Sequence, residues 1–332
     1  MVYAKFPWNG DKMNKQDFDP EVYEFYKPAL EGPGFYAPFS VDDVQALRDD
    51  EVSRHAKNTD PYEVSEMFEK FIVRDGEEPL LVRIYIPKAV DKKAKSAPVI
   101  LYFHGGGFIM GCVEDHDPLC GKLADELSAV VISVEYRLAP EDPFPAAIDD
   151  AVCAAKWAFE NAKKFGGDPD KLMAGGDSSG ANIAAVLALL GKEGKAPSLS
   201  YLILFYGVFG CVDLADSETA KKYGGGDYVL PEKTMEKMME IYVPEDADPN
   251  DIRLNPGRAK DLTGFPPVFM ATAEFDPLRS DSEEFARRLE EAGVEVEYKM
   301  MDGMMHGFVL YWQRFHRVEE LIKEIGEKVK SL

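Results

Sequence analysis

The sequence contains few cysteines and no long apolar run. Four cysteines occur among 332 residues, and none is part of a Cys-x-x-Cys pair. Reduced structural thiols are therefore expected rather than a disulfide framework or a metal site. No run approaches the roughly 18 apolar residues of a membrane helix, and residues 1–12 lack the apolar core of a signal peptide. A cytoplasmic protein without a membrane span is the resulting expectation.

Positive charge is also scarce. The chain has 38 Lys and Arg residues against 60 Asp and Glu residues, which gives a formal net charge of −22 at pH 7. Such a surface repels nucleic acids and anionic lipids, so functions that bind polyanions are disfavoured and no nucleic-acid partner is expected. Hydrophobic residues form 45% of the chain, which is enough for one large catalytic core with a cap or for two ordinary domains.

Strand and helix patterns alternate along most of the chain. Residues 69–74 and 80–86 alternate in polarity like an antiparallel pair, and residues 98–103 form a continuous apolar run typical of a strand buried on both faces. Further strands are expected at 129–134, 171–174, 201–206, 267–272 and 294–300, with helices at 117–127, 146–165, 280–292 and 311–330. The order predicts an α/β fold with a mostly parallel, eight-stranded sheet and helices on both faces.

Two segments depart from this alternation. Residues 1–40 are dense in aromatic residues among prolines and glycines, and we expect them to cover an apolar surface rather than form a core of their own. A helix is expected from the N-cap Ser40 to about Ala56. Residues 208–264 separate two strands by far more than an ordinary connection, which predicts an insertion and a candidate lid.

A short motif between a strand and a helix carries the first sign of chemistry. Gly176-Asp-Ser-Ser-Gly180 fits the pattern Gly-x-Ser-x-Gly, in which a serine is exposed on a sharp strand-to-helix turn. A serine hydroxyl is a weak nucleophile, so it needs a base, a group that orients the base, and donors for the oxyanion that forms. Ser178 is the candidate nucleophile.

The base is expected among five histidines, because the unperturbed imidazole pKa of about 6.5 lets this side chain accept and return a proton near neutral pH. His306 directly follows the last expected strand, where active-site loops of parallel sheets lie. His104 opens a glycine run and is expected to hold the shape of that loop. The others are expected to be packing or surface residues: His55, His116 and His316.

The orienting acid is expected at Asp276, which follows the strand at 267–272. Its rivals in the same regions are Glu274, Asp281 and Asp302. The order Ser178, Asp276, His306 matches the order of the triad in α/β-hydrolases.

The oxyanion donors are expected in His104-Gly105-Gly106-Gly107-Phe108, directly after the strand at 98–103. Successive glycines allow consecutive amides to point one way and leave room for a substrate oxygen. The amide of Ser179 is expected to complete the hole. A simple tight turn is the alternative, but a second motif at a matching strand end argues against coincidence.

Taken together, the motifs make the chain similar to the hormone-sensitive lipase branch of the α/β-hydrolases, the bacterial family IV carboxylesterases. The resemblance spans about residues 70–330 and includes further motifs at 136–146, at Asp276-Pro-Leu278 and at His306-Gly-Phe308. It implies an α/β-hydrolase fold with a helical cap made of residues 1–62 and 208–264, over a catalytic core made of residues 63–207 and 265–332.

The resemblance also implies a reaction. Ser178 would be the nucleophile, His306 its base and Asp276 the partner of that base, with an oxyanion hole formed by the amides of Gly106, Gly107 and Ser179. The family usually has alanine at position 179, but only the backbone amide is needed there. The substrate would be a small carboxylic ester of short to medium acyl length, with no cofactor and no metal. A homodimer is left open.

Two other functions are considered. An amidase or deacetylase of the same fold would use the same residues on another bond. A non-catalytic receptor is also known on this scaffold, as in the gibberellin receptors, but these lack the catalytic histidine that His306 provides here. Arg137 and Glu141 are expected to form a buried ion pair near the glycine loop. Met235, Met238 and Met239 are expected to fill the core, with a place in the acyl pocket as the alternative.

Overall fold

A computed structural model describes residues 15–31, 35, 38–74 and 76–332. Its centre is an eight-stranded sheet with the order β1-β2-β4-β3-β5-β6-β7-β8. The strands are β1 (Glu66–Arg74), β2 (Glu77–Ile86), β3 (Ala97–Phe103), β4 (Val130–Val134), β5 (Gly167–Asp177), β6 (Leu202–Phe205), β7 (Val268–Phe275) and β8 (Val296–Met305). β2 pairs antiparallel with β1 and β4, and all other neighbours are parallel. The predicted mostly parallel sheet is confirmed.

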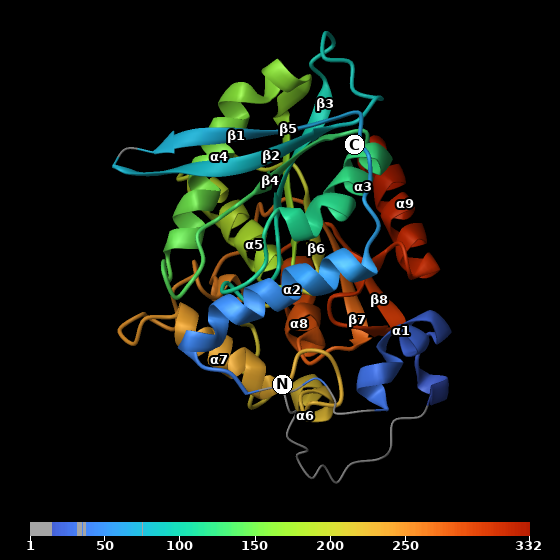
Figure 1. Cartoon of the computed structure of the whole chain (residues 1–332). Helices are drawn as coiled ribbons and strands as arrows, with labels where there is room; N and C mark the ends of the chain where they lie inside the picture. Colours follow the sequence, from blue (N-terminus) through green and yellow to red (C-terminus); the bar gives the residue numbers. More distant parts are fainter. Residues whose placement is uncertain (1–14, 32–34, 36–37, 75) are drawn as a thin grey trace.

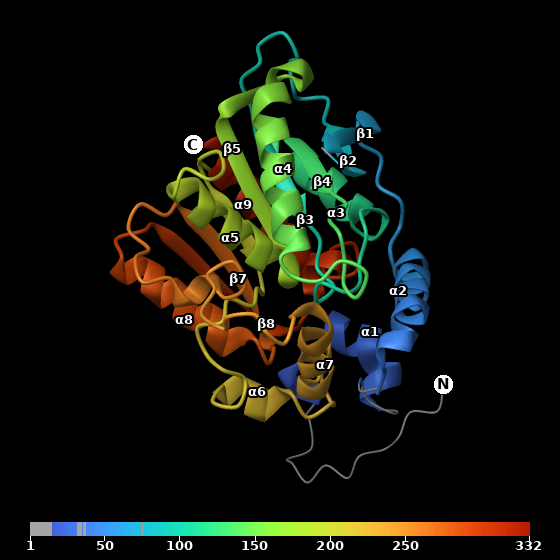
Figure 2. The same cartoon turned by 90° about the vertical axis from the view of Figure 1, so that its left-hand side faces the viewer.

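Helices cover both faces of this sheet (Figures 1 and 2). They are α1 (Pro20–Leu30), α2 (Val44–Asn58), α3 (Asp117–Leu127), α4 (Ala146–Asn161), α5 (Ser179–Lys192), α6 (Glu218–Tyr223), α7 (Glu232–Tyr242), α8 (Arg279–Glu291) and α9 (His316–Lys330). In β3, Leu101 packs into the apolar cluster of α4, α5 and α8, whereas Ile100 and Tyr102 pack into the cluster of α3 and α9. Because successive side chains of a strand point to opposite faces, a strand with two apolar faces requires a helical layer on each side.

The remaining helices gather near the carboxyl ends of the parallel strands. In Figures 1 and 2, α1, α2, α6 and α7 lie together beyond that end of the strands. The helix predicted from Ser40 is observed as a short 3-10 turn, Val41–Asp43, that continues into α2. The Ser40 amide donates to the Asp43 carboxylate at 2.8 Å, which caps this start.

Some boundaries differ from the prediction. The last helix begins at His316 instead of residue 311, because Phe308–Tyr311 form a separate 3-10 turn. Helix α1 was not predicted, since its 11 residues include an internal proline, Pro28. Beside it, Phe18 packs against Phe275 with ring centroids 4.8 Å apart, so part of the N-terminal segment covers an apolar surface as expected. Residues 1–14, 32–34 and 36–37 of that segment lie outside the described part.

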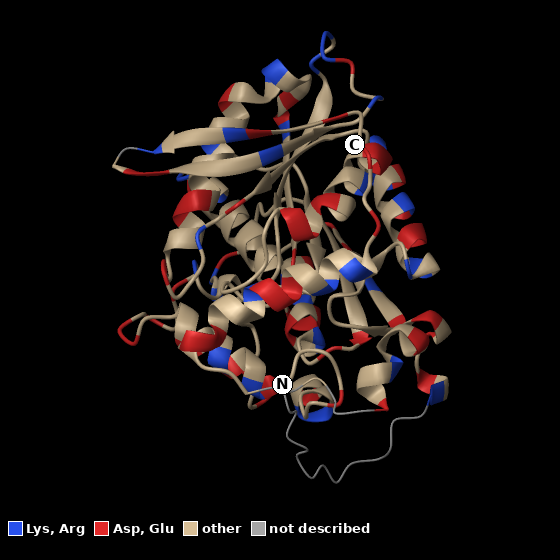
Figure 3. Ribbon diagram, viewed as in Figure 1, with Lys and Arg blue, Asp and Glu red and all other residues tan. Residues whose placement is uncertain are grey.

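Acidic residues are distributed along the whole ribbon (Figure 3). Among the described residues, no helix is both long and apolar enough to cross a bilayer. All four cysteines are unpaired, and Cys120 is buried in the core. Cys153 and Cys211 are partly buried and pack against the core, as expected for structural thiols.

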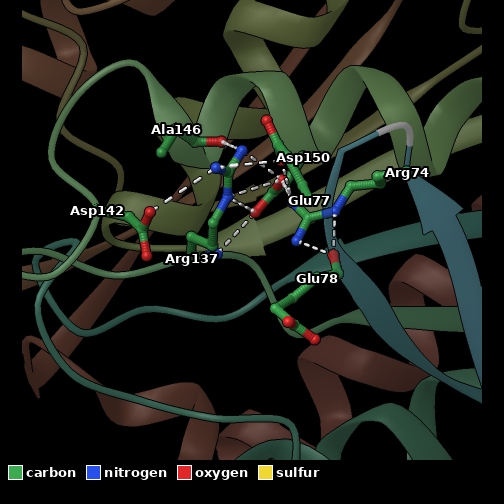
Figure 4. A network of polar contacts seen from close by, with 7 residues as sticks. All are labelled: Arg74, Glu77, Glu78, Arg137, Asp142, Ala146 and Asp150. Carbon is green, nitrogen blue, oxygen red and sulfur yellow. Dashed lines mark hydrogen bonds and ion pairs between the residues drawn. The ribbon is translucent and has the colours of Figure 1, made fainter.

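The prediction of an ion pair between Arg137 and Glu141 is wrong. Arg137 Nη2 lies 2.9 Å from Oδ1 of the buried Asp150, and its own backbone amide donates to the other oxygen of the same carboxylate at 2.9 Å. Arg74 from β1 binds Asp150 as well (Figure 4). Glu141 instead accepts two hydrogen bonds from Arg48 of α2, at 2.8 and 3.0 Å. The true partners come from elements distant in sequence, which a local motif does not indicate.

Candidate active site

Ser178 occupies a strained turn between β5 and α5. Its φ of 54° and ψ of −119° lie outside the conformations common for residues with a side chain. The turn is held by the Ser178 amide, which donates to the Phe205 carbonyl of β6 at 2.9 Å. A Cβ atom at Gly180 would collide with the Phe103 carbonyl of β3, so the helix approaches the sheet this closely only with glycine there. The strain and its support present the Ser178 hydroxyl at the end of the sheet.

The hydroxyl faces a histidine and, behind it, a carboxylate. His306 Nε2 lies 3.0 Å from Ser178 Oγ, and His306 Nδ1 lies 2.8 Å from Asp276 Oδ2. Because the carboxylate can only accept, Nδ1 carries the proton and Nε2 is left to accept from the hydroxyl. Asp276 is fully buried and also accepts the Leu278 amide at 2.8 Å. The three residues predicted from the sequence are thus brought into one hydrogen-bonded chain.

The rival acids bind elsewhere. Glu274 accepts the Gly303 amide at 2.8 Å. Asp281 accepts the amides of Gly210 and Val212 at 3.1 and 2.9 Å, so it supports the loop that follows β6. Neither of these two carboxylates is bonded to His306, and the third rival, Asp302, is exposed, so Asp276 is the acid that binds His306.

The glycine loop after β3 is fixed by its neighbours. The Gly105 amide, expected among the oxyanion donors, donates to Asp177 Oδ1 at 3.1 Å. The His104 carbonyl accepts the Tyr136 hydroxyl at 2.7 Å, and the two rings stack with centroids 4.1 Å apart. Burial lowers the pKa of His104 to about 3, with a further contribution from His116, so this imidazole is neutral at pH 7. His104 shapes the loop, as expected.

His116 has a larger part in the site than the sequence suggested. Its Nε2 lies 3.1 Å from Asp177 Oδ1 and its Nδ1 lies 3.2 Å from the Cys112 carbonyl, while the residue is only 2% exposed. Both ring nitrogens face acceptors, which favours the doubly protonated ring. Burial opposes both charges, but their mutual attraction raises the pKa of His116 and lowers that of Asp177. The one signal in the sequence was the position of Asp177, an acid directly before the nucleophile. Its burial, which creates the need for a partner, is seen only in the structure.

A cavity of about 270 Å³ opens above Ser178. Its walls include the glycine loop, Ser179 and His306, together with side chains from α2 and α7. Helix α7 contributes Met235, Met238 and Met239. The prediction that these methionines fill the core is therefore incomplete, because they also line the cavity. Helix α2 contributes three polar side chains, which the sequence did not identify as site residues: Glu51, Arg54 and His55.

Known proteins share this arrangement. The family model described as alpha/beta hydrolase fold matches residues 100–310, which include the glycine loop, the serine turn, Asp276 and His306. The chain belongs to the α/β-hydrolase family. Its relatives place it in the hormone-sensitive lipase-like branch, which confirms the resemblance carried by the motifs.

Named relatives of this α/β-hydrolase include carboxylesterase NlhH of Mycobacterium tuberculosis, 39% identical over 246 residues that make up 73% of this chain and 75% of the relative. An ethyl acetate hydrolase of Pseudomonas putida is 36% identical over 257 residues, 76% of either chain. Among solved structures, an ester-hydrolase from the Lake Arreo metagenome, complexed with a bipyridine phosphonate derivative, is 32% identical. It superimposes with a TM-score of 0.84 over 95% of this chain and 98% of its own.

Proposed function

We propose that this α/β-hydrolase cleaves carboxylic esters through an acyl-enzyme on Ser178. The chain of hydrogen bonds from Ser178 through His306 to Asp276 carries the proposal. Ser178 Oγ attacks the ester carbonyl carbon while its proton passes to His306 Nε2. Collapse of the tetrahedral intermediate breaks the bond to the alcohol oxygen, which leaves with that proton. Water then attacks the acyl-enzyme by the same route and restores Ser178.

The oxyanion of each intermediate is held by backbone amides. The Gly105 amide is engaged by Asp177, which leaves the amides of Gly106, Gly107 and Ser179 as the donors. Gly106 and Gly107 have φ angles of 118° and 62°, conformations that only glycine adopts easily and that turn the amides of a loop away from regular structure. Preorganised donors of this kind cost no reorganisation when the charge develops.

Small esters of short to medium acyl length are the proposed substrates. The cavity of about 270 Å³ is suited to small molecules, and relatives carry the names carboxylesterase and ethyl acetate hydrolase. The methionines of α7 are flexible apolar side chains that adapt to different acyl groups. No step in the mechanism uses a metal or a cofactor.

The division into cap and core belongs to the same proposal. Residues 1–62 and 208–264 form the cap, and residues 63–207 and 265–332 form the catalytic core. The pocket lining supports it, because α2 and α7 both contribute to the walls around Ser178. Substrate selection would then depend on the cap, and bond cleavage on the core.

Cytoplasmic location and a homodimer complete the proposal. Four unpaired cysteines fit a reducing compartment. The edge strand β1 exposes an apolar row of Met67, Phe71 and Val73, with exposed fractions of 51%, 63% and 81%. Such a row on an unpaired edge favours association with a second copy of the strand.

Covalent trapping tests the nucleophile. An alkyl fluorophosphonate phosphonylates an activated serine and releases fluoride, so we expect one adduct, on the peptide that contains Ser178, with parallel loss of ester hydrolysis. Replacing the base, His306→Ala, should slow labelling by about a hundredfold or more. The control His316→Ala, at an exposed histidine, should label at the wild-type rate. An adduct on another residue, or full activity after stoichiometric labelling, would refute the proposal.

A further inference from the structure

One buried carboxylate in the cavity wall has no partner that explains its position. The Glu51 side chain is 13% exposed, and its Oε2 atom is buried without a hydrogen-bond partner among the described residues. Its other oxygen lies 3.6 Å from Arg54 Nη2, which is too long for a hydrogen bond. Buried polar groups are almost always bonded, so a carboxylate that lines a substrate cavity without a hydrogen bond from a described residue to either oxygen points to a ligand group as its partner.

From this geometry we infer that Glu51 selects esters that carry a hydroxyl group, which bonds to the Glu51 carboxylate when the substrate fills the cavity. Glu51 and Ser178 line the same cavity, so one small ester can contact both. The inference rests on the proposed function and names the substrate class of the same site.

The surroundings of Glu51 favour a hydroxyl over an ammonium group. Arg54 on the same helix would repel a cation, and His116, which also lines the cavity, adds positive charge near Glu51. Asp115 and Asp177 face Glu51 from the segment before α3 and from β5, and burial, opposed by Arg54, raises the pKa of Glu51 to about 7. Near neutral pH both forms of Glu51 therefore occur. A hydroxyl can donate to the carboxylate and accept from the acid, whereas an ammonium group suits only the charged form.

Glu51 is not needed to hold α2 in place. Arg48, one turn earlier, donates to the Ile109 and Ala139 carbonyls at 2.8 and 2.9 Å and binds Glu141. Further along the helix, His55 Nδ1 lies 3.4 Å from the Asp115 carbonyl. These contacts fix the helix to both loops around the site, so a structural role for the Glu51 carboxylate is not apparent.

Two matched pairs of substrates test the inference. In each pair a hydroxyl replaces a methyl group of similar size. The acyl pair is the 4-nitrophenyl esters of 3-hydroxybutyrate and 3-methylbutyrate, and the alcohol pair is 3-hydroxypropyl butyrate and butyl butyrate. We expect wild-type kcat/KM to favour the hydroxylated member of at least one pair by about tenfold, because a site built to bond a hydroxyl rejects the analogue that lacks it.

Substitutions at position 51 assign the preference. Glu51→Leu should lower the ratio of the two kcat/KM values by about tenfold, and Glu51→Gln should lower it less, because an amide oxygen still accepts. The Tm of Glu51→Leu should equal or exceed that of the wild type, because burial of the wild-type carboxylate costs free energy that no hydrogen bond offsets. Asp50→Asn, at an exposed carboxylate on the same helix outside the cavity, should keep the wild-type ratio.

The outcomes separate the two proposals. A wild-type ratio within about twofold of unity in both pairs, or an unchanged ratio in Glu51→Leu, overturns the selectivity while ester hydrolysis stands. If Glu51→Leu and Glu51→Gln both have a lower Tm, and both lose kcat/KM equally on the two members of each pair, the selectivity is overturned and Glu51 has a structural role. Failure of the wild type to cleave any of the four esters would refute the proposed function itself.

Discussion

At the scale of single residues, Asp177 connects the nucleophile to the glycine loop. It directly precedes Ser178, and its Oδ1 accepts the Gly105 amide at 3.1 Å and the Tyr102 hydroxyl at 3.0 Å. His116 lies on the same oxygen at 3.1 Å. One carboxylate therefore sets the distance between the attacking serine and the proposed oxyanion donors, and His116 compensates its buried charge.

The stability due to this pair should depend on pH. The folded pKa of His116 is raised above its ordinary value of 6.5, so its contribution is complete below that pH and is lost as the pH rises through the raised pKa. The folded pKa of Asp177 is lowered from 3.8, so its contribution is present above that pH and is lost as the pH falls through the lowered pKa. The stabilisation should thus be greatest between about pH 4 and pH 6.5.

Urea unfolding of wild type and His116→Gln across pH 4.5 to 10 measures this effect. We expect the difference in the free energy of unfolding to shrink as the pH becomes alkaline. His316→Gln, at an exposed histidine, should show a small difference at every pH. A difference for His116→Gln that grows with pH would mean that the ring is neutral in the folded protein.

At the scale of elements, a buried ion network fastens the β1–β2 hairpin to α4. Asp150 of α4 is fully buried and binds Arg74 of β1 and Arg137 of the segment after β4 (Figure 4). Both arginines also contact Glu77 at the start of β2, at 3.1 and 3.2 Å. Removing the central carboxylate would leave two partly buried guanidinium groups without their main partner.

Asp150→Ala should therefore lower the free energy of unfolding by about 3 kcal/mol. The neighbouring Asp149→Ala, at an exposed carboxylate on the same helix, should change it by less than about 1 kcal/mol. Urea titration monitored by circular dichroism measures both. Equal effects of the two substitutions would show that the network adds nothing beyond the surface charge of α4.

The sequence predicts elements better than their partners. Strands such as β3 are recognisable because both faces are apolar, and the turns at Ser178 and at the glycine loop have local motifs. Ser178, Asp276 and His306 could be placed at strand ends, and parallel strand ends meet at one edge of the sheet. Helix α1 was not predicted because of its internal proline, whereas the partner of Arg137 and the burial of His116 depend on contacts between distant segments, for which the sequence has no periodic signal. Glu51 was missed for the same reason.

At the scale of the whole molecule, the exposed edge of the sheet bears on assembly. β1 is the first strand in the sheet order. Met67, Phe71 and Val73 lie on this strand, and each residue is more than half exposed. Residues two apart in a strand share a face, so the three lie on one face of β1, with the charged Glu69 between Met67 and Phe71. Pairing of two such edges would place the two sets of side chains beside one another on the sheet face and bury part of each.

We expect the protein to be dimeric at micromolar concentration in size-exclusion chromatography with light scattering. Phe71→Lys combined with Val73→Lys should convert it to a monomer, because charges would face one another across the shared edge. Lys222→Glu, an exposed charge change on α6, should leave the dimer intact. A monomeric wild type, or a dimer that persists in the double variant, would rule out association through β1.

The central claim is that Ser178 attacks the ester carbonyl. The most direct measurement is the turnover of 4-nitrophenyl butyrate by Ser178→Ala, with the Tm determined on the same preparation. We expect kcat to fall by at least about a thousandfold. The Tm should be unchanged or slightly higher, because the substitution removes only the hydroxyl of a residue in a strained turn. A folded Ser178→Ala protein that retains more than about a tenth of the wild-type kcat would contradict the mechanism.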